Sequence, residues 1–498
     1  MKRSRSGILS IPLLALVVTG AAAAPAAAQQ DTLTLSLAEA LRLARDGNPG
    51  FLAARNDEDE ADWAVREAYG SLLPSASFGG SLQWQGAGEQ RFGSLTLAQN
   101  QPAYYLSSYD VGLSYALDGG RLLAPAAARA RRTATVAQIH AAEVSLQAAV
   151  TRAYLEVLRR AEGEVLAAQQ LERARFNLRL ARRQQEVGTV TPLDARRAEV
   201  QVGRAEVALL QAANARATAG LRLLQQIGSD ADRPLVLTTT FALEEPTWQR
   251  DALLALALER NQTLAARRAT LDAGSVQVRQ ARSAYLPTLS ARAGLSGFTR
   301  EASSTTSLIQ QAQSGVGQLV QSCVLFNDIY RRLATPLPTN DCSALRFTDE
   351  QRNRIVADNS AFPFGFSRQP ASASLSLSLP VFQGLGRERQ LEAAKVQRED
   401  ADLQLREQRI ALAVDLSIGL RAVTTAYRSA VLEEHNRAVA DEQLRLAGER
   451  YRVGAISIVD LVDAETVKAE ADQAYVNAVF AYHDAVAELE AVVGSELR

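Results

Sequence analysis

The sequence has few cysteine, methionine, histidine and aromatic residues. Of its 498 residues, two are cysteine, one is methionine, three are histidine, and 6% are aromatic. Two cysteines cannot build a disulfide framework. Hydrophobic residues make up 47% of the chain and charged residues 22%, a composition that excludes a collagen or an acidic disordered chain. Because 54 basic residues face 55 acidic ones, the chain has no excess positive charge with which to hold nucleic acid.

Sequence motifs of catalysis are also missing. His140, His435 and His483 are isolated in helical segments, and the chain has no His-Glu-x-x-His, no paired cysteine ligands, no phosphate-binding glycine loop and no nucleophile elbow. We therefore expect no enzymatic activity, no cofactor and no metal site. The three histidines are interpreted as ordinary helix residues.

The first 28 residues predict an export signal. Lys2, Arg3 and Arg5 precede an apolar run from Ile8 to Val18, and the alanines at 26–28 offer a cleavage site. No cysteine follows directly, so we expect an exported protein without a lipid anchor. Beyond the signal, no stretch of about 18 apolar residues is free of charges, which predicts no transmembrane helix. Entry into a membrane would then require β-structure.

The remainder contains an internal repeat. Matching residues of the two copies are 213 positions apart near the start of each copy and 266 positions apart near its end. The distance grows because the second copy has an insertion at 299–370. We therefore expect a signal peptide at 1–28, a first repeat at 29–228, a linker at 229–248, a second repeat at 249–494 and a tail at 495–498. The recurring residues are Leu41, Ala44, Asn48, Val65, Arg66, Leu73 and Pro74 at the first offset, and Val187, Gly188, Asp194, Ala198, Glu199 and Gly228 at the second.

Four segments alternate apolar and polar residues with the period of a β-strand. They are 75–84, 109–117, 288–298 and 371–381, and in the last of them leucines alternate with serines. Each is close to the 9 to 11 residues that a tilted strand needs to cross a bilayer. A half-buried sheet of a water-soluble protein is the alternative for any single segment. Four matched strands between very long helices favour the membrane.

Most other segments predict α-helix. Segments 120–187 and 387–453 are rich in Ala, Arg, Leu, Gln and Glu, and each would be about 100 Å long. Shorter helices are predicted at 36–72, 192–227, 249–285 and 458–493. An alanine stripe with alternating steps of three and four predicts coiled-coil packing. Its members are Ala464, Val467, Ala471, Ala474, Ala478, Ala481 and Ala485, matched by Ala198, Gln201, Ala205, Ala208, Ala212, Ala215 and Ala219.

Across nearly the whole exported chain, the sequence resembles the TolC-like outer-membrane factor family. The matching motifs are LAEAL at 37–41, Asn48-Pro49, Leu73-Pro74, DGGR at 118–121, and the turns VGTVTPLD at 187–194 and VGAISIVD at 453–460. The resemblance implies a mainly α protein with a transmembrane β part. In such a homotrimer each protomer gives four strands to a 12-stranded outer-membrane barrel, and duplicated coiled-coil hairpins form a periplasmic tunnel.

Elementary physics also requires oligomerisation of such a chain. Four strands leave two open edges, and in lipid every backbone polar group needs a partner. Two protomers would give an acceptable 8 strands, so the trimer is what the resemblance implies.

The resemblance further implies an outer-membrane exit channel of a tripartite efflux system in a Gram-negative bacterium. Its partners would be a periplasmic adaptor (membrane fusion protein), an inner-membrane RND- or ABC-type pump, and outer-membrane lipid. The alternatives are the exit duct of a type I protein secretion system, and a periplasmic coiled-coil adaptor or scaffold. An adaptor should have one hairpin and no membrane-length strands, which favours the channel. A passive tube takes its cargo from its pump, so the sequence does not name the cargo.

The two turns are expected at the periplasmic tip, where Val187, Gly188, Thr189, Val453, Gly454 and Ala455 would dock the adaptor. Asp194 fits a helix N-terminal cap. Asp460 and Asp463 lie three positions apart on one helical face, and the resemblance places such a pair in rings of carboxylates at the tunnel entrance. In a trimer these rings would attract multivalent cations, and repulsion would raise some of their pKa values.

One position departs from the family pattern. Ile456 stands where the best-known members carry an arginine, so an ion pair from this position to Asp194 cannot form. Arg197, the counterpart of Asp463 in the repeat, is our candidate substitute.

The insertion at 299–370 holds both cysteines, Cys323 and Cys342. Family geometry places it outside the cell, where a pair 19 positions apart is expected to form a disulfide worth about 3 kcal/mol. Two unpaired cysteines are the alternative. This Ser-, Gln- and Asn-rich stretch is a candidate to cap or narrow the outer mouth.

Overall fold

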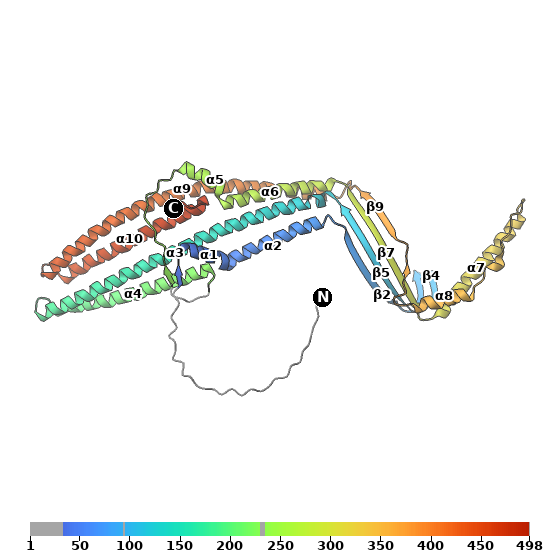
Figure 1. The fold of residues 1–498 in the computed structure, drawn as a ribbon, viewed down its shortest axis with the longest axis horizontal. Coiled ribbons are helices and arrows are strands. Elements are labelled where there is room, and N and C mark those ends of the chain that lie inside the picture. Colours follow the sequence, from blue (N-terminus) through green and yellow to red (C-terminus); the bar gives the residue numbers. More distant parts are fainter. Residues whose placement is uncertain (1–32, 93–94, 230–234, 498) are drawn as a thin grey trace, which may run out of the picture. The chain divides into compact units, whose positions relative to one another are not determined.

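The computed structural model describes residues 33–92, 95–229 and 235–497, so the expected signal peptide lies outside the described residues. Figure 1 shows the helices and strands of these residues. The chain divides into two compact units, each made of several segments. The first unit comprises Met1–Leu52, Ser145–Thr247 and Gly419–Leu489. The second comprises Ala53–Val144, Trp248–Ile418 and Glu490–Arg498.

Long helices make up most of both units. α3 (Gly119–Glu186) and α9 (Gly386–Arg452) begin and end within one residue of their predicted bounds. α4 (Pro192–Ile227) and α10 (Ile458–Val493) match the prediction at both ends. Sequence composition therefore located these four helices correctly.

The helices expected at 36–72 and 249–285 are each broken in two, which corrects the prediction. α1 (Leu37–Gly47) and α2 (Pro49–Gly70) meet at Asn48, while α5 (Arg250–Arg260) and α6 (Gln262–Arg282) meet at Asn261. Both asparagines are extended, with ψ near 117°, and their side chains accept hydrogen bonds from the N–H groups of Phe51 and Leu264. Each asparagine thus ends one helix and caps the next.

In each repeat, the break near its start is also bonded to the helix at its end. Asn48 donates from Nδ2 to the Gln226 carbonyl, and Asn261 donates to the Val492 carbonyl, each at 2.8 Å. Gly228 and Gly494, which follow these helix ends, both have φ near +78°. The internal repeat of the sequence is therefore a repeat of local structure.

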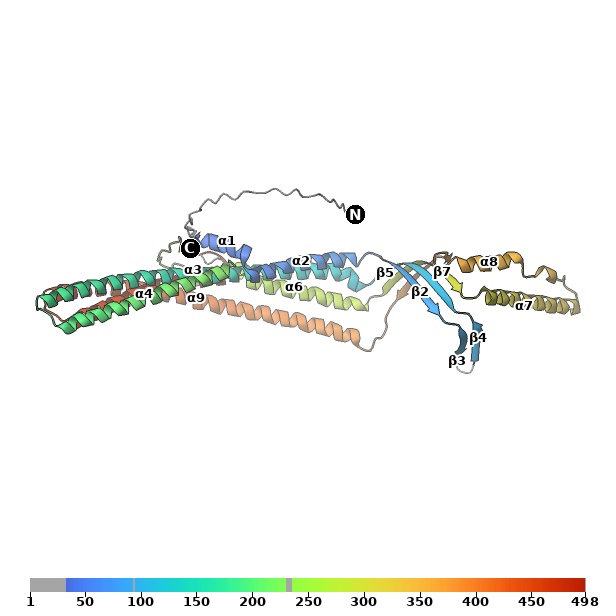
Figure 2. The ribbon, with the colours of Figure 1, turned by 90° about the horizontal axis from the view of Figure 1, so that it is seen from below.

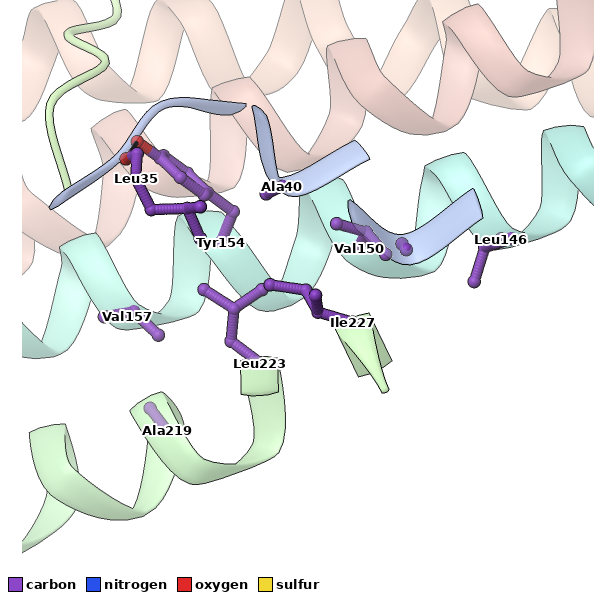
Figure 3. Close-up of a cluster of buried hydrophobic side chains, with 10 residues drawn as sticks. Leu35, Ala40, Leu146, Val150, Tyr154, Val157, Ala219, Leu223 and Ile227 are labelled. Atoms are coloured by element: carbon purple, nitrogen blue, oxygen red, sulfur yellow. Dashed lines mark hydrogen bonds between the residues drawn. The ribbon is translucent and has the colours of Figure 1, made fainter. Parts of the chain in front are cut away.

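The first unit has a core of apolar side chains from α1, α3 and α4 (Figure 3). Tyr154 on α3 is fully buried, and its hydroxyl donates to the Leu35 carbonyl at 2.9 Å and accepts from the Thr239 N–H at 3.1 Å. Strands β1 (Leu33–Leu35) and β6 (Leu235–Leu237) pair in parallel beside it. The buried members are Leu35, Ala40, Ala44, Leu146, Val150, Tyr154, Val157, Ala219, Leu223 and Ile227.

The predicted alanine stripe lies on the buried side of both shorter helices. Ala198, Ala219 and Ala464 are at most 6% exposed, and the other members are half-buried apart from Val467 and Ala481, which are exposed. Small side chains at these positions allow close approach of neighbouring helices.

The four predicted strands form one antiparallel sheet in the second unit, in the order β2, β5, β7 and β9. β2 (Ser75–Gln85) matches its prediction, whereas β5 (Tyr104–Leu117) and β7 (Thr288–Ala302) are longer than expected. β9 (Ser372–Ser378) is shorter, because Pro380 has no N–H to donate to a ladder. A two-residue strand, β8 (Ser367–Arg368), also pairs with β7.

The sheet has one apolar and one polar face, as the alternation predicted. Across the strands Phe78, Val111 and Leu295 form one row, and Ser75, Ser114, Arg292 and Ser374 form a row on the opposite face. In the protomer the apolar face is uncovered, with Phe78 78% and Leu295 53% exposed. Within the described residues β2 and β9 are edge strands, each paired on one side.

Both connections at one end of the sheet contain structure that the sequence analysis did not predict (Figure 2). Between β2 and β5 lies a hairpin of β3 (Gly88–Phe92) and β4 (Leu95–Gln101). The insertion contains α7 (Thr305–Arg332), a short 3-10 helix (Cys342–Ala344) and α8 (Asp349–Ser360).

The prediction of no membrane-length apolar helix needs one qualification. Among the described residues, α9 contains an 18-residue window with a mean hydropathy of 1.3, of which 17% is buried. By length and composition alone it could cross a membrane, but it is a short part of a 67-residue helix whose flanks are charged. This is weak support for a span.

Candidate functional site: the two hairpin turns

The first hairpin joins α3 to α4 through a tight turn. The helix ends at Glu186, Gly188 adopts φ +78°, and the Thr189 N–H returns to the Gln184 carbonyl at 2.9 Å. Asp194 then accepts hydrogen bonds from the N–H and hydroxyl of Thr191, at 3.0 and 2.7 Å. Asp194 therefore stabilises the start of α4, which is the capping role that its position suggested.

The second hairpin, α9 to α10, repeats this geometry. Gly454 has φ +75°, and the Ala455 N–H donates to the Arg450 carbonyl at 2.9 Å. Asp460 accepts from the N–H and hydroxyl of Ser457, at 2.9 and 2.7 Å. The two turns are thus structural duplicates, and Asp460 caps its helix just as Asp194 does.

The carboxylates of the second turn are available to solvent. Asp460 and Asp463 are both exposed on α10. The hydrogen bonds from the Ser457 hydroxyl and N–H hold the pKa of Asp460 below its ordinary value. In the protomer Asp460 is therefore a carboxylate anion at neutral pH.

The candidate latch residues lie near one another but do not form a strong ion pair. Arg197 lies with Nη1 3.9 Å from Oδ1 of Asp194, one turn away on its own helix, and both are partly exposed. Such a pair contributes little. Ile456 instead packs half-buried against Tyr451, Ile458 and Leu461. Ile456 thus belongs to an apolar cluster of the second turn.

Tyr451 is a site residue that the sequence analysis missed. It is 3% exposed, and its hydroxyl has no hydrogen-bond partner within the described part of the chain. Burial, together with the negative charge of Asp194, raises the pKa of Tyr451. Tyr451 lines a pocket together with Gln184, Thr189 and Asp194, so the end of α9 lies against the first turn. The sequence offered one indication of this role, because Tyr451 lies in the last turn of α9, directly before the turn at Gly454.

The two hairpins are joined near their turns. A groove of about 370 Å³ lies between α4 and α10, lined by Leu193, Arg197, Val200, Ile458 and Val462 among others. Farther along, Asn177 on α3 donates to Oε1 of Glu465 on α10 at 2.6 Å. Burial raises the pKa of Glu465, outweighing the opposing effects of this bond and of Arg173.

We expect Glu465→Gln to stabilise the protein at neutral pH. A buried acid with a raised folded-state pKa keeps its proton longer than in the unfolded chain, so stability falls as pH rises from the ordinary value to the raised one. The variant keeps the acceptor for Asn177 and loses this dependence. Its thermal midpoint should exceed that of the wild type at pH 8 and equal it at pH 4.

The counterpart Glu199→Gln is the control. Glu199 has a half-exposed side chain that pairs with Arg196 at 2.9 Å. A gain at pH 8 in this variant as large as in Glu465→Gln would contradict the assignment of the effect to burial.

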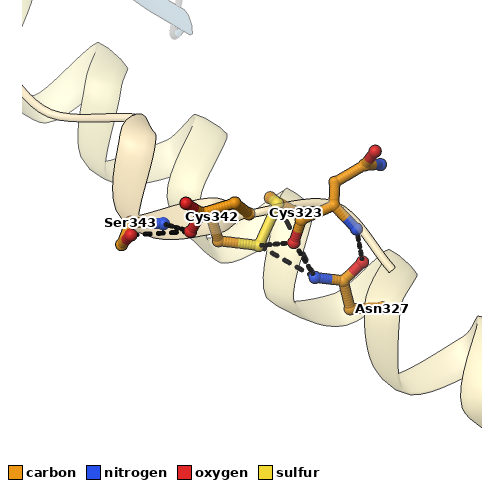
Figure 4. The surroundings of a disulfide bond; sticks show 6 residues. Cys323, Asn327, Cys342 and Ser343 are labelled. Atoms are coloured by element: carbon orange, nitrogen blue, oxygen red, sulfur yellow. Dashed lines mark hydrogen bonds between the residues drawn. A yellow bond between two sulfur atoms is a disulfide. The ribbon is translucent and has the colours of Figure 1, made fainter. Parts of the chain in front are cut away.

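The insertion holds the two cysteines as a disulfide, with Cα atoms 5.8 Å apart (Figure 4). No group of three or more histidine, cysteine or acidic side chains within the described residues is placed to hold a metal ion.

Comparisons with known proteins agree with this architecture. The profile of the family described as "Outer membrane efflux protein" matches residues 40–229 and 348–495, more than half of the chain. Among solved structures, the CmeC channel of Campylobacter jejuni is 17% identical with a TM-score of 0.68, covering 92% of this chain and 85% of that one. MtrE of Neisseria gonorrhoeae, in its open state, is 19% identical with a TM-score of 0.66, covering 93% and 89%.

A third structure, VceC of Vibrio cholerae, is 15% identical with a TM-score of 0.66, covering 93% of this chain and 97% of that one. No curated protein matches the sequence.

Long duplicated hairpins attached to a small two-faced sheet define the class of outer-membrane channels with a helical tunnel. The chain belongs to the outer membrane efflux protein family, the TolC-like channels. It is an outer-membrane efflux channel that extends into the periplasm. Channels of this family are trimers that work with efflux pump components and are not enzymes, which confirms the expectation of a non-enzymatic protein.

Proposed function

We propose that three copies of this chain form a passive exit duct for small molecules, with four strands per protomer (β2, β5, β7 and β9) in a 12-stranded barrel. The observation that carries the proposal is the sheet with one uncovered apolar face and two edge strands. In lipid such edges have to be paired, and a barrel pairs them. Neighbouring protomers supply the partners for β2 and β9.

The long helices support the same assembly. On α9, Ile410, Val414 and Ile418 follow at intervals of four and are 59%, 50% and 60% exposed in the protomer. Residues at this spacing lie on one helical face. We expect a neighbouring protomer to cover this ridge, which would explain the apolar window of α9 without a membrane span.

The hairpin turns are our proposed docking sites for a periplasmic adaptor that connects the channel to an inner-membrane pump of RND or ABC type. Val187 and Val453 are 74% and 78% exposed at the two duplicated turns. Exposed apolar residues on a rigid turn suit a second helical hairpin as partner. The adjacent Gly188, Thr189, Gly454 and Ala455 keep the turns narrow.

Deletion of the gene tests the cargo. We expect the deletion strain to become sensitive to small toxic compounds and to keep normal levels of secreted proteins. In a separate experiment, we expect a cross-linker placed at Val453 to capture the periplasmic adaptor. Loss of a secreted polypeptide without a change in drug sensitivity would replace small-molecule efflux by type I secretion.

Asp460 and Asp463 are our proposed entrance carboxylates. Three copies of the pair would gather six carboxylates around the threefold axis, which attracts multivalent cations. We expect millimolar hexaamminecobalt(III) to block the conductance of the wild-type channel in planar bilayers and to leave the Asp460→Ala, Asp463→Ala double variant conducting.

Asp272→Ala is the control, since this exposed carboxylate of α6 lies outside both hairpins. Block that is the same in all three proteins would show that the cation binds elsewhere. Because Asp460 caps α10, Asp460→Asn serves as a second variant that removes the charge and keeps a capping oxygen.

A further inference from the structure

The unexplained element is α7, in the insertion between β7 and β9. The family match breaks off at residue 229 and resumes at 348, so α7 lies outside it. Yet the insertion is firmly attached to the sheet. Asn359 of α8 bonds both the N–H and the carbonyl of Ala302, at 2.7 and 3.1 Å, and Phe366 packs edge-on against Tyr109 with ring centroids 4.9 Å apart.

One face of α7 is covered by the chain that follows it (Figure 4). The Cys323–Cys342 disulfide fixes this strap, Asn327 exchanges two hydrogen bonds with the backbone of Asn340, at 2.8 and 2.9 Å, and the Leu337 N–H donates to the Tyr330 carbonyl. Asn327 is accordingly buried, at 8% exposed. The strap decides which face of α7 remains open.

The open face is apolar and has the spacing of a coiled-coil seam. Leu319, Phe326 and Ile329 are 59%, 53% and 44% exposed, and Leu325 beside them is 60% exposed. Leu333, the extended C-cap residue directly after the helix, is 42% exposed. Continued toward the start of the helix, the seam has alternating steps of four and three, the heptad pattern of helices that pack together. Its positions are Leu308, Ala312, Gly315, Leu319, Ser322, Phe326, Ile329 and Leu333.

We propose that the α7 helices of three protomers pack through this seam into a three-helix coiled coil, the outer collar of the channel. The proposal rests on the trimer of the proposed function. The trimer already brings three copies of β7 into one ring, and only Ser303 and Ser304 separate β7 from α7. The small residues Ala312, Gly315 and Ser322 of the seam permit close approach of the three helices.

A lipid surface is a less suitable partner for the apolar face of α7 than other α7 helices. Helices that lie on lipid headgroups are rich in lysine and arginine on their polar side. From Thr305 to Asn327, α7 has no charged residue, and its polar side is mainly glutamine, serine and threonine, with the exposed Val324 among them. An uncharged polar side combined with a heptad seam fits helix association better.

Cysteine cross-linking in the full-length trimer tests the collar. Leu319→Cys places a thiol in the seam, and Gln321→Cys places one on the polar side of the same helix. Under mild oxidation we expect Leu319→Cys to give a disulfide-linked dimer on non-reducing gels, with the third chain unlinked, because one thiol bonds only one other. Gln321→Cys and the wild type, whose cysteines are already paired, should stay monomeric on these gels.

Oligomeric state measured on the same samples by light scattering separates the collar from the trimer. Trimers in which Leu319→Cys forms no more dimer than Gln321→Cys would overturn the collar and leave the proposed function intact. If that thiol were then also shielded from a water-soluble maleimide, lipid or another partner would be the occupant. Absence of trimers would overturn the proposed function itself.

Discussion

Leu295→Arg is expected to abolish assembly of the channel in the outer membrane, whereas Ser296→Arg is expected to assemble normally. Leu295 lies at the centre of β7, on the apolar face, opposite Val111. Ser296 is its neighbour on the polar face, opposite Asp110. An arginine facing lipid near the bilayer midplane costs about 2–4 kcal/mol, and a trimer carries three of them. On the polar face the same arginine meets water and an acid.

The amount of trimer in outer-membrane fractions, followed on unheated gels, measures this difference. Ser296→Arg should in addition shift ion selectivity toward anions in planar bilayers, because it adds positive charge to the lumen. Equal trimer levels for the two variants would mean that the apolar face does not meet lipid, and the barrel would have to be abandoned.

Gly228→Ala is expected to destabilise the protein far more than Gly188→Ala. Both glycines have φ +78°, where a side chain costs roughly 1–2 kcal/mol. A Cβ at Gly188 would meet nothing within 4 Å, whereas a Cβ at Gly228 would lie 2.0 Å from the Gly47 carbonyl oxygen. That contact is with backbone, so α1 and the end of α4 would have to separate, and the Asn48 bond to Gln226 would be lost with them.

Thermal loss of helical circular dichroism in the purified trimer measures both variants. We expect a decrease of a few degrees for Gly188→Ala and a much larger decrease, or no folded protein, for Gly228→Ala. The repeat provides an internal check, since Gly494→Ala should behave like Gly228→Ala because its Cβ would lie 2.6 Å from the Arg260 carbonyl oxygen. Similar midpoints for Gly188→Ala and Gly228→Ala would show that backbone strain alone governs these sites.

The candidate site could be predicted in part. The duplicated VG turns and the capping of Asp194 follow from local preferences, because glycine favours positive φ and a carboxylate near a helix start finds free N–H groups. The position of Tyr451 against the first turn and the bond between Asn177 and Glu465 join residues that are distant in sequence. Helix periodicity alone does not say which faces of two hairpins meet.

The insertion could also be predicted only in part. The disulfide was expected from the export signal and the cysteine count. No helix was expected at 305–332, because serine, glutamine and asparagine are frequent there and interrupt the apolar heptad. The strap across Cys323, Asn327 and Tyr330 could not be foreseen either. It covers the side of α7 that holds these three residues and leaves the face of Leu319 and Phe326 open.

By itself the sequence determined the longest helices, the main strands and the repeat of this protein. It specified four long helices to within a residue, four two-faced strands and two copies of one plan, because each depends on periodicity and on glycine and proline within a few residues. The tertiary structure decided the bonds from Asn48 and Asn261 to the ends of α4 and α10, the pairing of β5 with β7, and the contacts between hairpins. These depend on partners 100 or more positions away, whose approach no local pattern encodes.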